Sequence, residues 1–521
     1  MTAVVTAPSS NAHAYYSLRR FRRALAWFLS GKAMAALLAL ATFALVVRLA
    51  PVEEYGAYVT LLAAAELGIA LAAFGVDWIA LRYIPECRST GDHRALARFS
   101  AGLLIVHCFT LAVGACAGYF LLVLVGPHID IAPWRGLFGL WMVILVVEGV
   151  ARFARDILLG SLLLQGYAQG ALVLRNIVQI AMLGILAGTG TVVDARMLTC
   201  VELITAIASA LAGIGFLAAA LARPRDEPVN AAHWSLPPRN RLAKVAFHNY
   251  TTAILNQAFA PSVLTIVCGA FFGASGAAML GFGLRVTDLV NKYLPVNFLV
   301  HVLRPMMIAR YVDGASFSRL NQQAMLAYKA SMVVLLPAIV LVALHGPLLI
   351  GLVTGNKYEE AAPVLLVLLA YLIARNHLAL LGIVLNAVER MALATRALLI
   401  SLLLLPIVLL LARSGLGPLG LVLGVLIESL VSNALIVAGL RRAGYPYVLQ
   451  RGALGRIALA GMVAYLPIAA LATGPVSPTL ALLQCAIALL ILGGALLLLR
   501  PFTHEERQAM RRVVPDFSRG A

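Results

Sequence analysis

The sequence contains little charge. Only 12% of its 521 residues are charged, and 62% are hydrophobic. A soluble domain carries about 25% charged residues, so this composition excludes a soluble globular protein. Apolar runs of about 20 residues, the length that spans a bilayer, recur between residues 25 and 500. A transmembrane barrel would show alternating apolar and polar residues over segments of about 10 residues, and the sequence shows no such alternation. The sequence therefore predicts an all-α polytopic membrane protein.

Cysteine clusters and enzyme motifs are also missing. The six cysteines include no C-x-x-C pair, and five of them lie within apolar runs. They are expected to be small buried residues, with no metal site and no disulfide framework. The sequence has no P-loop, no H-E-x-x-H and no G-x-S-x-G motif. We therefore expect a protein that is not an enzyme and that has no bound cofactor.

The basic residues are numerous but scattered. The formal net charge is +18, a value that invites a nucleic-acid partner. However, the Lys and Arg side chains occur in short loops between apolar runs, which is the pattern of membrane topology. We therefore expect no nucleic-acid partner. The first 23 residues are polar and show no cleavable signal, so the first apolar run is expected to remain as an anchor.

Fourteen spans are predicted from the apolar runs. They are 25–49, 56–80, 99–125, 136–163, 170–190, 196–222, 247–272, 276–302, 324–352, 361–387, 393–412, 417–440, 455–473 and 479–499. Alternate loops, taken with both termini, hold 31 of the 40 basic residues, and the opposite loops hold five. By the positive-inside rule, both termini are predicted to be cytoplasmic.

The longest polar connection divides the chain into two lobes. We predict a cytoplasmic N-terminal segment (1–24), a six-span N-lobe (25–222), a linker (223–246) and a six-span C-lobe (247–440). Two appended spans (441–499) and a cytoplasmic tail (500–521) follow. The lobes resemble each other weakly, because Gly56 and Gly276, like Pro85 and Pro305, are 220 positions apart. Parallel repeats of this kind are a transporter architecture, although common residues also coincide by chance.

Several charged residues fall inside the predicted spans. Four of the 40 basic residues are not assigned to a loop or a terminus: Lys32, Arg285, Lys292 and Arg375. Arg285, Asp288 and Lys292 share one helical face in the stretch GFGLRVTDLVNKYLP. The fourth span repeats this arrangement with Glu148, Arg152, Arg155 and Asp156, and further intramembrane acids are Glu66, Asp77, Glu202 and Glu428. Each intramembrane charge costs about 2.5–3.5 kcal/mol on insertion scales, so it needs a partner or a wet cavity.

Two interpretations of these charges remain open. In the first, they pair structurally: Asp288 with Lys292, Glu148 with Arg152, and Asp156 with Arg152 or Arg155. In the second, spare cations line a cavity for an anionic substrate, since guanidinium groups bind phosphate bidentately. The acids likewise are either partners of arginine or sites that couple transport to a proton or cation. We assign Glu66, Asp77, Glu148 and Asp288 to this group of pairing or coupling acids.

Three stretches resemble a known family. They are 45–86, with the turn Pro51–Gly56, then 263–310 and 354–390. Together they are similar to the polysaccharide transporters of the multidrug/oligosaccharidyl-lipid/polysaccharide (MOP) flippase superfamily, the O-antigen and exopolysaccharide repeat-unit flippases. The family's Pro-Glu-Glu-Tyr-Gly-like turn carries Val52 as an insertion here. The likeness covers residues 20 to 440.

The resemblance implies two six-helix lobes around a central cationic cavity and alternating access. The cavity's basic residues in relatives match Lys32 and Arg285, and Lys292 less closely. The predicted substrate-binding set also includes Arg152, Arg155 and Arg375. The second span departs from the family because it holds Glu66 and Asp77 and no mid-span arginine.

The resulting hypothesis is a multi-pass flippase of the bacterial inner membrane. Its substrate would be an undecaprenyl-pyrophosphate-linked oligosaccharide repeat unit, moved from the cytoplasmic to the periplasmic face. The expected partners are this lipid-linked oligosaccharide, the bilayer, and the polymerase and chain-length components of polysaccharide assembly. Coupling to a proton, to sodium or to the membrane potential is open. The alternatives are a lipid II flippase, a drug/cation antiporter of the same superfamily, and a membrane glycan polymerase or ligase.

Overall fold

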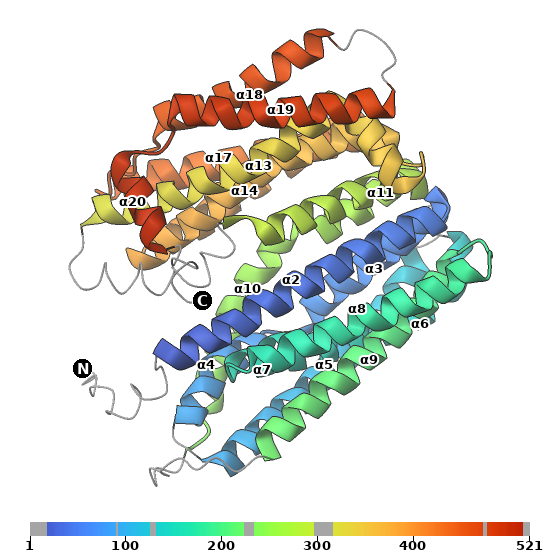
Figure 1. Ribbon diagram of the computed structural model, residues 1–521. Helices are drawn as coiled ribbons and strands as arrows, with labels where there is room; N and C mark the ends of the chain where they lie inside the picture. The colour runs from blue at the N-terminus through green and yellow to red at the C-terminus, as the bar shows by residue number, and fades with distance from the viewer. Residues whose placement is uncertain are drawn as a thin grey trace. The chain divides into compact units, whose positions relative to one another are not determined.

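The computed structural model describes residues 18–89, 92–125, 132–222, 234–295, 316–471 and 477–513. Within these ranges the regular elements are all helical, and twelve segments are long and apolar enough to cross a membrane. The prediction of an all-α multi-pass membrane protein is confirmed (Figure 1). Over the first predicted span the helix is Leu18–Leu49, of which Met34–Leu49 lies in the part described in full. The seventh and eighth predicted spans fall in one apolar segment, Arg239–Lys292, which holds the helices Arg239–Gln257 and Pro261–Tyr293 with a break at Gly273.

Packing divides the chain into two units, Met1–Ala278 and Met279–Ala521. The helices of the first unit are α2 (Leu18–Leu49), α3 (Val52–Ala72), α4 (Val76–Ser89), α5 (His93–Val125), η2 (Ala132–Leu137), α6 (Phe138–Arg152), η3 (Phe153–Leu158), α7 (Leu159–Ser161), α8 (Gln165–Gly188), α9 (Ala195–Ala222), α10 (Arg239–Gln257) and the first part of α11 (Pro261–Tyr293).

Long apolar runs form these helices because a helix satisfies its own backbone hydrogen bonds where no water is available. Small residues then let neighbouring helices approach closely. Gly68 of α3 lies against Leu145 of α6, and Gly149 of α6 lies against Leu111 of α5. The side chain of Asn176 in α8 donates a hydrogen bond to the Ala35 carbonyl in α2 (3.2 Å), so α2 and α8 run side by side (Figure 1).

The second predicted span is broken in the structure. Helix α3 ends at Ala72 and α4 begins at Val76, with left-handed backbone at Phe74 (φ 43°) and Gly75 (φ 77°). A side chain at position 75 would also overlap the backbone of Ala246 in α10. Glycine is therefore required here both for its conformation and for the close approach of α10. Asp77 begins a new helix rather than ending a continuous span.

The fourth predicted span contains a turn of π-helix. Residues Phe153–Leu158 are wound more widely than the α-helical residues before them. Single turns of this kind occur inside α-helices, frequently at functional sites. Here the wide turn carries Arg155 and Asp156, two of the charges that interrupt the apolar pattern of the span.

The second unit contains the remainder of α11 and the later helices. These are α13 (Phe317–Thr354), η4 (Glu359–Ala361), α14 (Ala362–Ala387), α15 (Ala392–Leu402), α16 (Leu405–Arg413), α17 (Pro418–Arg442), α18 (Arg451–Leu471), α19 (Pro478–Leu499) and α20 (His504–Val513). Helix α20 lies in what the sequence analysis describes only as a tail. Helix α13 contains Pro337 and Pro347 and departs from helical geometry at His345.

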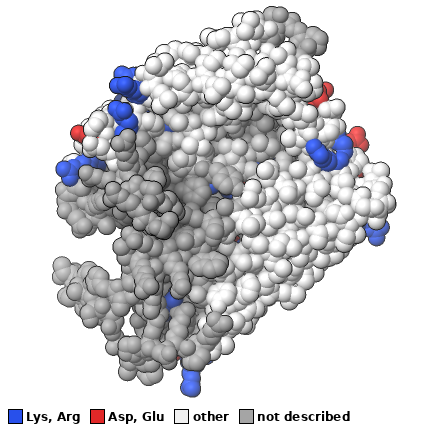
Figure 2. All heavy atoms as spheres, viewed as in Figure 1, with Lys and Arg blue, Asp and Glu red and all other residues white. Residues whose placement is uncertain are grey.

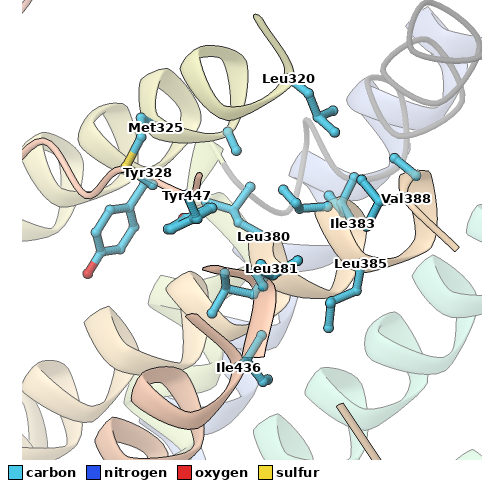
Figure 3. Close-up of a cluster of buried hydrophobic side chains, with 14 of the residues drawn as sticks. Leu320, Met325, Tyr328, Leu380, Leu381, Ile383, Leu385, Val388, Ile436 and Tyr447 are labelled. Carbon is cyan, nitrogen blue, oxygen red and sulfur yellow. The ribbon is translucent and has the colours of Figure 1, made fainter. Parts of the chain in front are cut away.

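Helices α13, α14 and α17 meet in a buried apolar cluster. Its members include Leu320, Met325 and Tyr328 of α13, Leu381 of α14 and Ile436 of α17 (Figure 3). Tyr447, from the connection between α17 and α18, completes it. A second cluster joins α13 to α18 and α19 through Val340, Ala460 and Ala488, among others. Helix α13 is thus the element that both clusters share.

The division between the two packing units falls within α11, after Ala278. The cause is α10, which packs on α3 and α4. The Tyr250 hydroxyl donates a hydrogen bond to the Leu71 carbonyl at the end of α3. Residues 223–233 of the linker lie outside the described ranges, and α10 begins at Arg239.

Surface charge is sparse. The described surface in Figure 2 is mostly free of Lys, Arg, Asp and Glu, and most of the basic side chains visible there lie toward its margins. Such a surface suits contact with lipid over the sides of the helices, with charge kept to their ends.

A candidate charged site among the membrane-spanning helices

Glu148 is the centre of an ion-pair network in the first unit. It lies in α6 with its side chain only 2% exposed. Its Oε1 atom is 2.7 Å from Nε of Arg152, one turn later, and 3.3 Å from Nη1 of Arg175 in α8. The predicted pairing of Glu148 with Arg152 is therefore present, and a second arginine adds to it.

The network continues in both directions. Arg175 hydrogen-bonds to Glu202 of α9, which also accepts a hydrogen bond from the Tyr58 hydroxyl of α3 (3.0 Å). On the other side, Nη2 of Arg152 lies 3.2 Å from Oε1 of Glu66 in α3. The Glu202 side chain is 3% exposed, whereas Glu66 and Arg152 are 39% and 33% exposed. The network thus runs from a buried end to an accessible end.

The charges of this network do not balance. It contains three carboxylates, Glu66, Glu148 and Glu202, and two guanidinium groups, Arg152 and Arg175. Oε2 of Glu148 and Nε of Arg175 are buried and have no hydrogen-bond partner within the described ranges. A buried polar atom without a partner is costly, so a further proton or cation at Glu148 would satisfy both the charge and the orphaned oxygen.

Arg155 belongs to a separate pair. Its guanidinium forms a bidentate contact with Asp156, 2.9 Å at each nitrogen, and Nη1 donates to the Ser209 hydroxyl of α9 (3.1 Å). Arg155 is only 5% exposed. The structure therefore places this predicted substrate ligand in a structural pairing with α9, away from the accessible end of the Glu148 network.

Asp77, another of the predicted pairing or coupling acids, is not part of the Glu148 network. Its Oδ1 atom is 4.0 Å from Nδ1 of His107 in α5. His107 is buried and stacks on Phe153, the first residue of the π-helical turn, with ring centroids 4.2 Å apart. The pair thus lies where the break before α4 and the wide turn of η3 come together.

The second unit holds three of the four remaining predicted cations. Nζ of Lys292 is 2.8 Å from Oδ2 of Asp288, so this predicted pair is also present. Arg285, one turn before Asp288, is exposed and forms no ion pair with a described acid. Arg375 in α14 is likewise exposed and hydrogen-bonds with Tyr371, one turn earlier. Lys32 lies in α2, and its side chain is outside the described part of the structure.

Glu428 of α17 has surroundings of a different kind. It is 7% exposed, and among the described residues no Lys, Arg or His lies within ion-pair distance. Instead its Oε1 accepts a hydrogen bond from Ser432 (2.9 Å), and the Ser432 hydroxyl lies 2.6 Å from the hydroxyl of Ser401 in α15. Hydroxyl groups, rather than a fixed cation, satisfy this carboxylate.

The sequence analysis missed two basic residues of the membrane helices. Arg175 falls within the predicted span 170–190, and α8 places it about 15 Å from the helix start. Lys329 falls within the predicted span 324–352, and its side chain in α13 is completely buried. Both are included in the total of loop charges above, although their positions inside predicted spans are the signal that identifies them.

The turn Pro51–Gly56 has a structural explanation. Oε2 of Glu54 accepts hydrogen bonds from the backbone amide of Ala195, at the start of α9, and from Nε1 of Trp134 in η2 (2.8 and 3.3 Å). A side chain at Gly56 would overlap the backbone carbonyl of Ala274 in the first part of α11. Residues 51–56, which include the first turn of α3, thus contact η2, the start of α9 and α11 next to its break at Gly273.

A bundle of membrane-spanning helices with internal charges and breaks has the architecture of a membrane transporter. The solved structure of lipid II flippase MurJ in an inward closed conformation is similar, with a TM-score of 0.67 and 12% identity, covering 93% of this chain and 99% of that one. An inward-facing multidrug resistance MATE transporter of the MOP superfamily is also similar, with a TM-score of 0.58, 18% identity, and coverage of 80% and 97%.

These similarities establish the fold. The chain has the fold of MOP-superfamily transporters, and the solved neighbours are transporters and flippases rather than enzymes. No protein-family model matches the sequence, and no curated protein matches it. The superfamily fold agrees with the resemblance, whereas the polysaccharide branch rests on the three sequence stretches alone.

Proposed function

We propose that the protein is a flippase for an undecaprenyl-pyrophosphate-linked oligosaccharide repeat unit, an O-antigen or exopolysaccharide precursor. It would move this substrate by alternating access from the cytoplasmic to the periplasmic face of the bacterial inner membrane. The observation that carries the proposal is Arg285, an exposed guanidinium on a membrane-spanning helix with no described acid as its partner.

The charges favour an anionic substrate. Asp288 neutralises Lys292, so the face of α11 that holds both retains the positive charge of Arg285. Arg375 of α14 adds a second exposed guanidinium in the same unit. An uncompensated charge is retained in a membrane helix when it serves a polar pathway. A guanidinium binds a phosphate through two parallel hydrogen bonds, so pyrophosphate fits these residues better than a neutral sugar does.

The fold favours a lipid-linked substrate. The MurJ structure is that of a lipid II flippase, and the coverage of both chains is nearly complete. In the proposed cycle the polyprenyl tail stays in the bilayer while the pyrophosphate and sugars cross. Lys32 and Arg285 would bind the pyrophosphate, with Lys292 and Arg375 assisting. Arg152, at the accessible end of the Glu148 network, would contact acidic sugars, and Arg155 would serve packing.

The Glu148 network supports a coupling role for its acids. Its extra carboxylate favours uptake of one proton or sodium ion, and Glu66 gives that ion an accessible entry. The inside-negative membrane potential would act on the same charges, at about 2.3 kcal/mol per charge per 100 mV. The polymerase and chain-length components of polysaccharide assembly are the proposed partners, because they use the flipped repeat unit.

The test uses cells in which the gene is deleted. Lipid-linked oligosaccharides are assayed on each face of the inner membrane, together with surface polysaccharide. We expect completed repeat units to accumulate on the cytoplasmic face and wild-type protein to restore export. Arg285→Ala should fail to restore export, and Arg285→Lys should restore part of it. Arg442→Ala, at the exposed last residue of α17, is the control and should restore export as wild type does.

The rival functions predict other results. Rescue of a strain that lacks its own peptidoglycan flippase would identify a lipid II flippase, the second candidate, which the fold of the solved neighbour favours. Transport of a small cationic dye without any glycan would identify an antiporter. Elongation of lipid-linked glycan by purified protein would identify a polymerase or ligase. Normal export in the deletion strain would remove the polysaccharide proposal.

A further inference from the structure

Helix α20 is attached to α13 by an ion pair that is fully buried. Nζ of Lys329 lies 2.6 Å from both carboxylate oxygens of Glu506. The two side chains are 0% and 1% exposed. The residues join the last described helix of the chain to a helix 177 positions earlier, both within the second unit.

The same glutamate also starts α20. The backbone amide of Thr503 donates to Oε2 of Glu506 (2.9 Å), and the backbone amide of Glu506 donates to the Thr503 hydroxyl (3.3 Å). This reciprocal pair is a capping box, which satisfies amides that the first turn leaves free. Glu506 therefore has two tasks, because one carboxylate both orders the helix start and binds Lys329.

Neighbouring residues bring α20 into position. Arg500 ends α19 in a left-handed conformation (φ 46°), and the short segment 500–503 connects it to α20. The ring of Phe502 lies 5.6 Å from Nζ of Lys329, a cation–π distance. Glu505 and Arg507, on either side of Glu506, are exposed. Only Glu506 among these three points into the protein.

The chemistry of the contact indicates that it is reversible. A buried ion pair contributes little net stability, because both ions lose their hydration, and an apolar pair of similar size would often hold as well or better. When α20 leaves, Lys329 and Glu506 regain water, so the released state is not penalised as two exposed apolar side chains would be. An ionic contact therefore suits a helix that docks and undocks.

We propose that α20 is a reversible latch on α13. When docked, it holds the first half of α13, residues 317–336, against the cluster formed with α14 and Tyr447 (Figure 3). Release of α20 frees this half, which precedes Pro337 and the irregular backbone at His345, to move relative to the rest of the helix. The latch concerns the second unit alone and holds whatever the substrate is.

Hydrogen–deuterium exchange of the full-length protein in lipid nanodiscs tests the latch without any substrate. Glu506→Gln leaves Lys329 buried without its counter-ion, so α20 should undock. We expect amide exchange to rise at least tenfold in both 504–513 and 317–336. Glu505→Gln is the matched control, because this neighbouring carboxylate is exposed, and it should leave both segments unchanged.

Two double variants separate a latch from ordinary packing. The charge swap Lys329→Glu with Glu506→Lys should restore much of the protection of residues 317–336. The pair Lys329→Met with Glu506→Gln removes the buried charge and keeps a side chain that can close the capping box, so exchange of 317–336 should return toward the wild-type rate. Exchange in this pair as fast as in Glu506→Gln alone, or faster exchange of 504–513 with 317–336 unchanged after Glu506→Gln, would overturn the proposal.

Discussion

Glu148 and Glu428 are both buried carboxylates in membrane-spanning helices, yet the two units accommodate them differently. Glu148 lies between two arginines, at 2.7 and 3.3 Å. Glu428 accepts a hydrogen bond from Ser432 and has no described cation within ion-pair distance. Two arginines stabilise the charged form of the first acid. Hydroxyl groups stabilise the second acid whether it carries a proton or not, so it is better suited to a reversible exchange.

The comparison predicts the largest effect at Arg175. Among the described residues, Arg175 is the one cation paired with Glu202 and one of two paired with Glu148, and Arg175→Met removes it. Two buried carboxylates are left under-compensated, so the free energy of unfolding should fall by about 3–5 kcal/mol. Denaturant unfolding in detergent micelles measures this loss, with the exposed Arg196→Met as control. A loss below about 1 kcal/mol would mean that the acids are already protonated.

A smaller loss is expected for Glu148→Gln. The substitution leaves two carboxylates facing two guanidinium groups, so the charges of the network become balanced while charge-assisted hydrogen bonds to Glu148 are weakened. The free energy of unfolding should fall by about 1.5–3 kcal/mol. The same unfolding titration measures it. A loss equal to that of Arg175→Met would show that the excess negative charge is not the main source of destabilisation in the network.

Glu428→Gln tests the other side of the comparison. An amide oxygen accepts the Ser432 hydrogen bond as the carboxylate does, so unfolding should become easier by only about 0.5–1.5 kcal/mol. Glycan export, measured as described for Arg285, should nevertheless decrease if reversible protonation or cation binding at Glu428 is needed. Ser414→Ala, an exposed position at the end of α16, is the control. Unchanged export would restrict coupling to the first unit.

The smallest effect is expected at the accessible end of the Glu148 network. Glu66 is 39% exposed and pairs with a half-exposed arginine at 3.2 Å. Glu66→Gln should therefore change the free energy of unfolding by only about 0.2–1 kcal/mol, since water screens such pairs. High salt should reduce the difference further. A loss as large as that of Glu148→Gln would show that this end is buried in the membrane-embedded protein.

The fold was largely predictable because bilayer thickness acts locally. Each apolar run of about 20 residues forms its own helix, and twelve such segments are present among the described residues. Pairs one turn apart, such as Glu148 with Arg152 and Asp288 with Lys292, were predictable for the same reason. The predicted gap 273–275 coincides with the non-helical Gly273. The prediction of a continuous span over 56–80 failed at Gly75, because one glycine interrupts a helix without changing the apolar pattern around it.

The site was less predictable because it depends on helices that are distant in sequence. No local pattern joins Arg175 to Glu202, which is 27 positions later, or Tyr58 to Glu202, which is 144 positions later. Arg152 and Arg155 looked equivalent in the sequence. The π-helical turn places Arg155 against Ser209, while Arg152 stays at the accessible end with Glu66. The predicted binding roles of Lys32, Arg285, Lys292 and Arg375 remain predictions that the export assay addresses.

The sequence by itself determined that the chain is helical, that it spans a membrane many times and that some spans carry charges. Those properties depend on hydrophobic length and on neighbours one turn away. Only the tertiary structure decided which charges meet. It gives Glu148 two arginines and Glu428 no cation among the described residues, and it brings Glu506 to Lys329 across 177 positions. The reason is physical, since the cost of a buried charge depends on its neighbours in space, and helix packing chooses those neighbours.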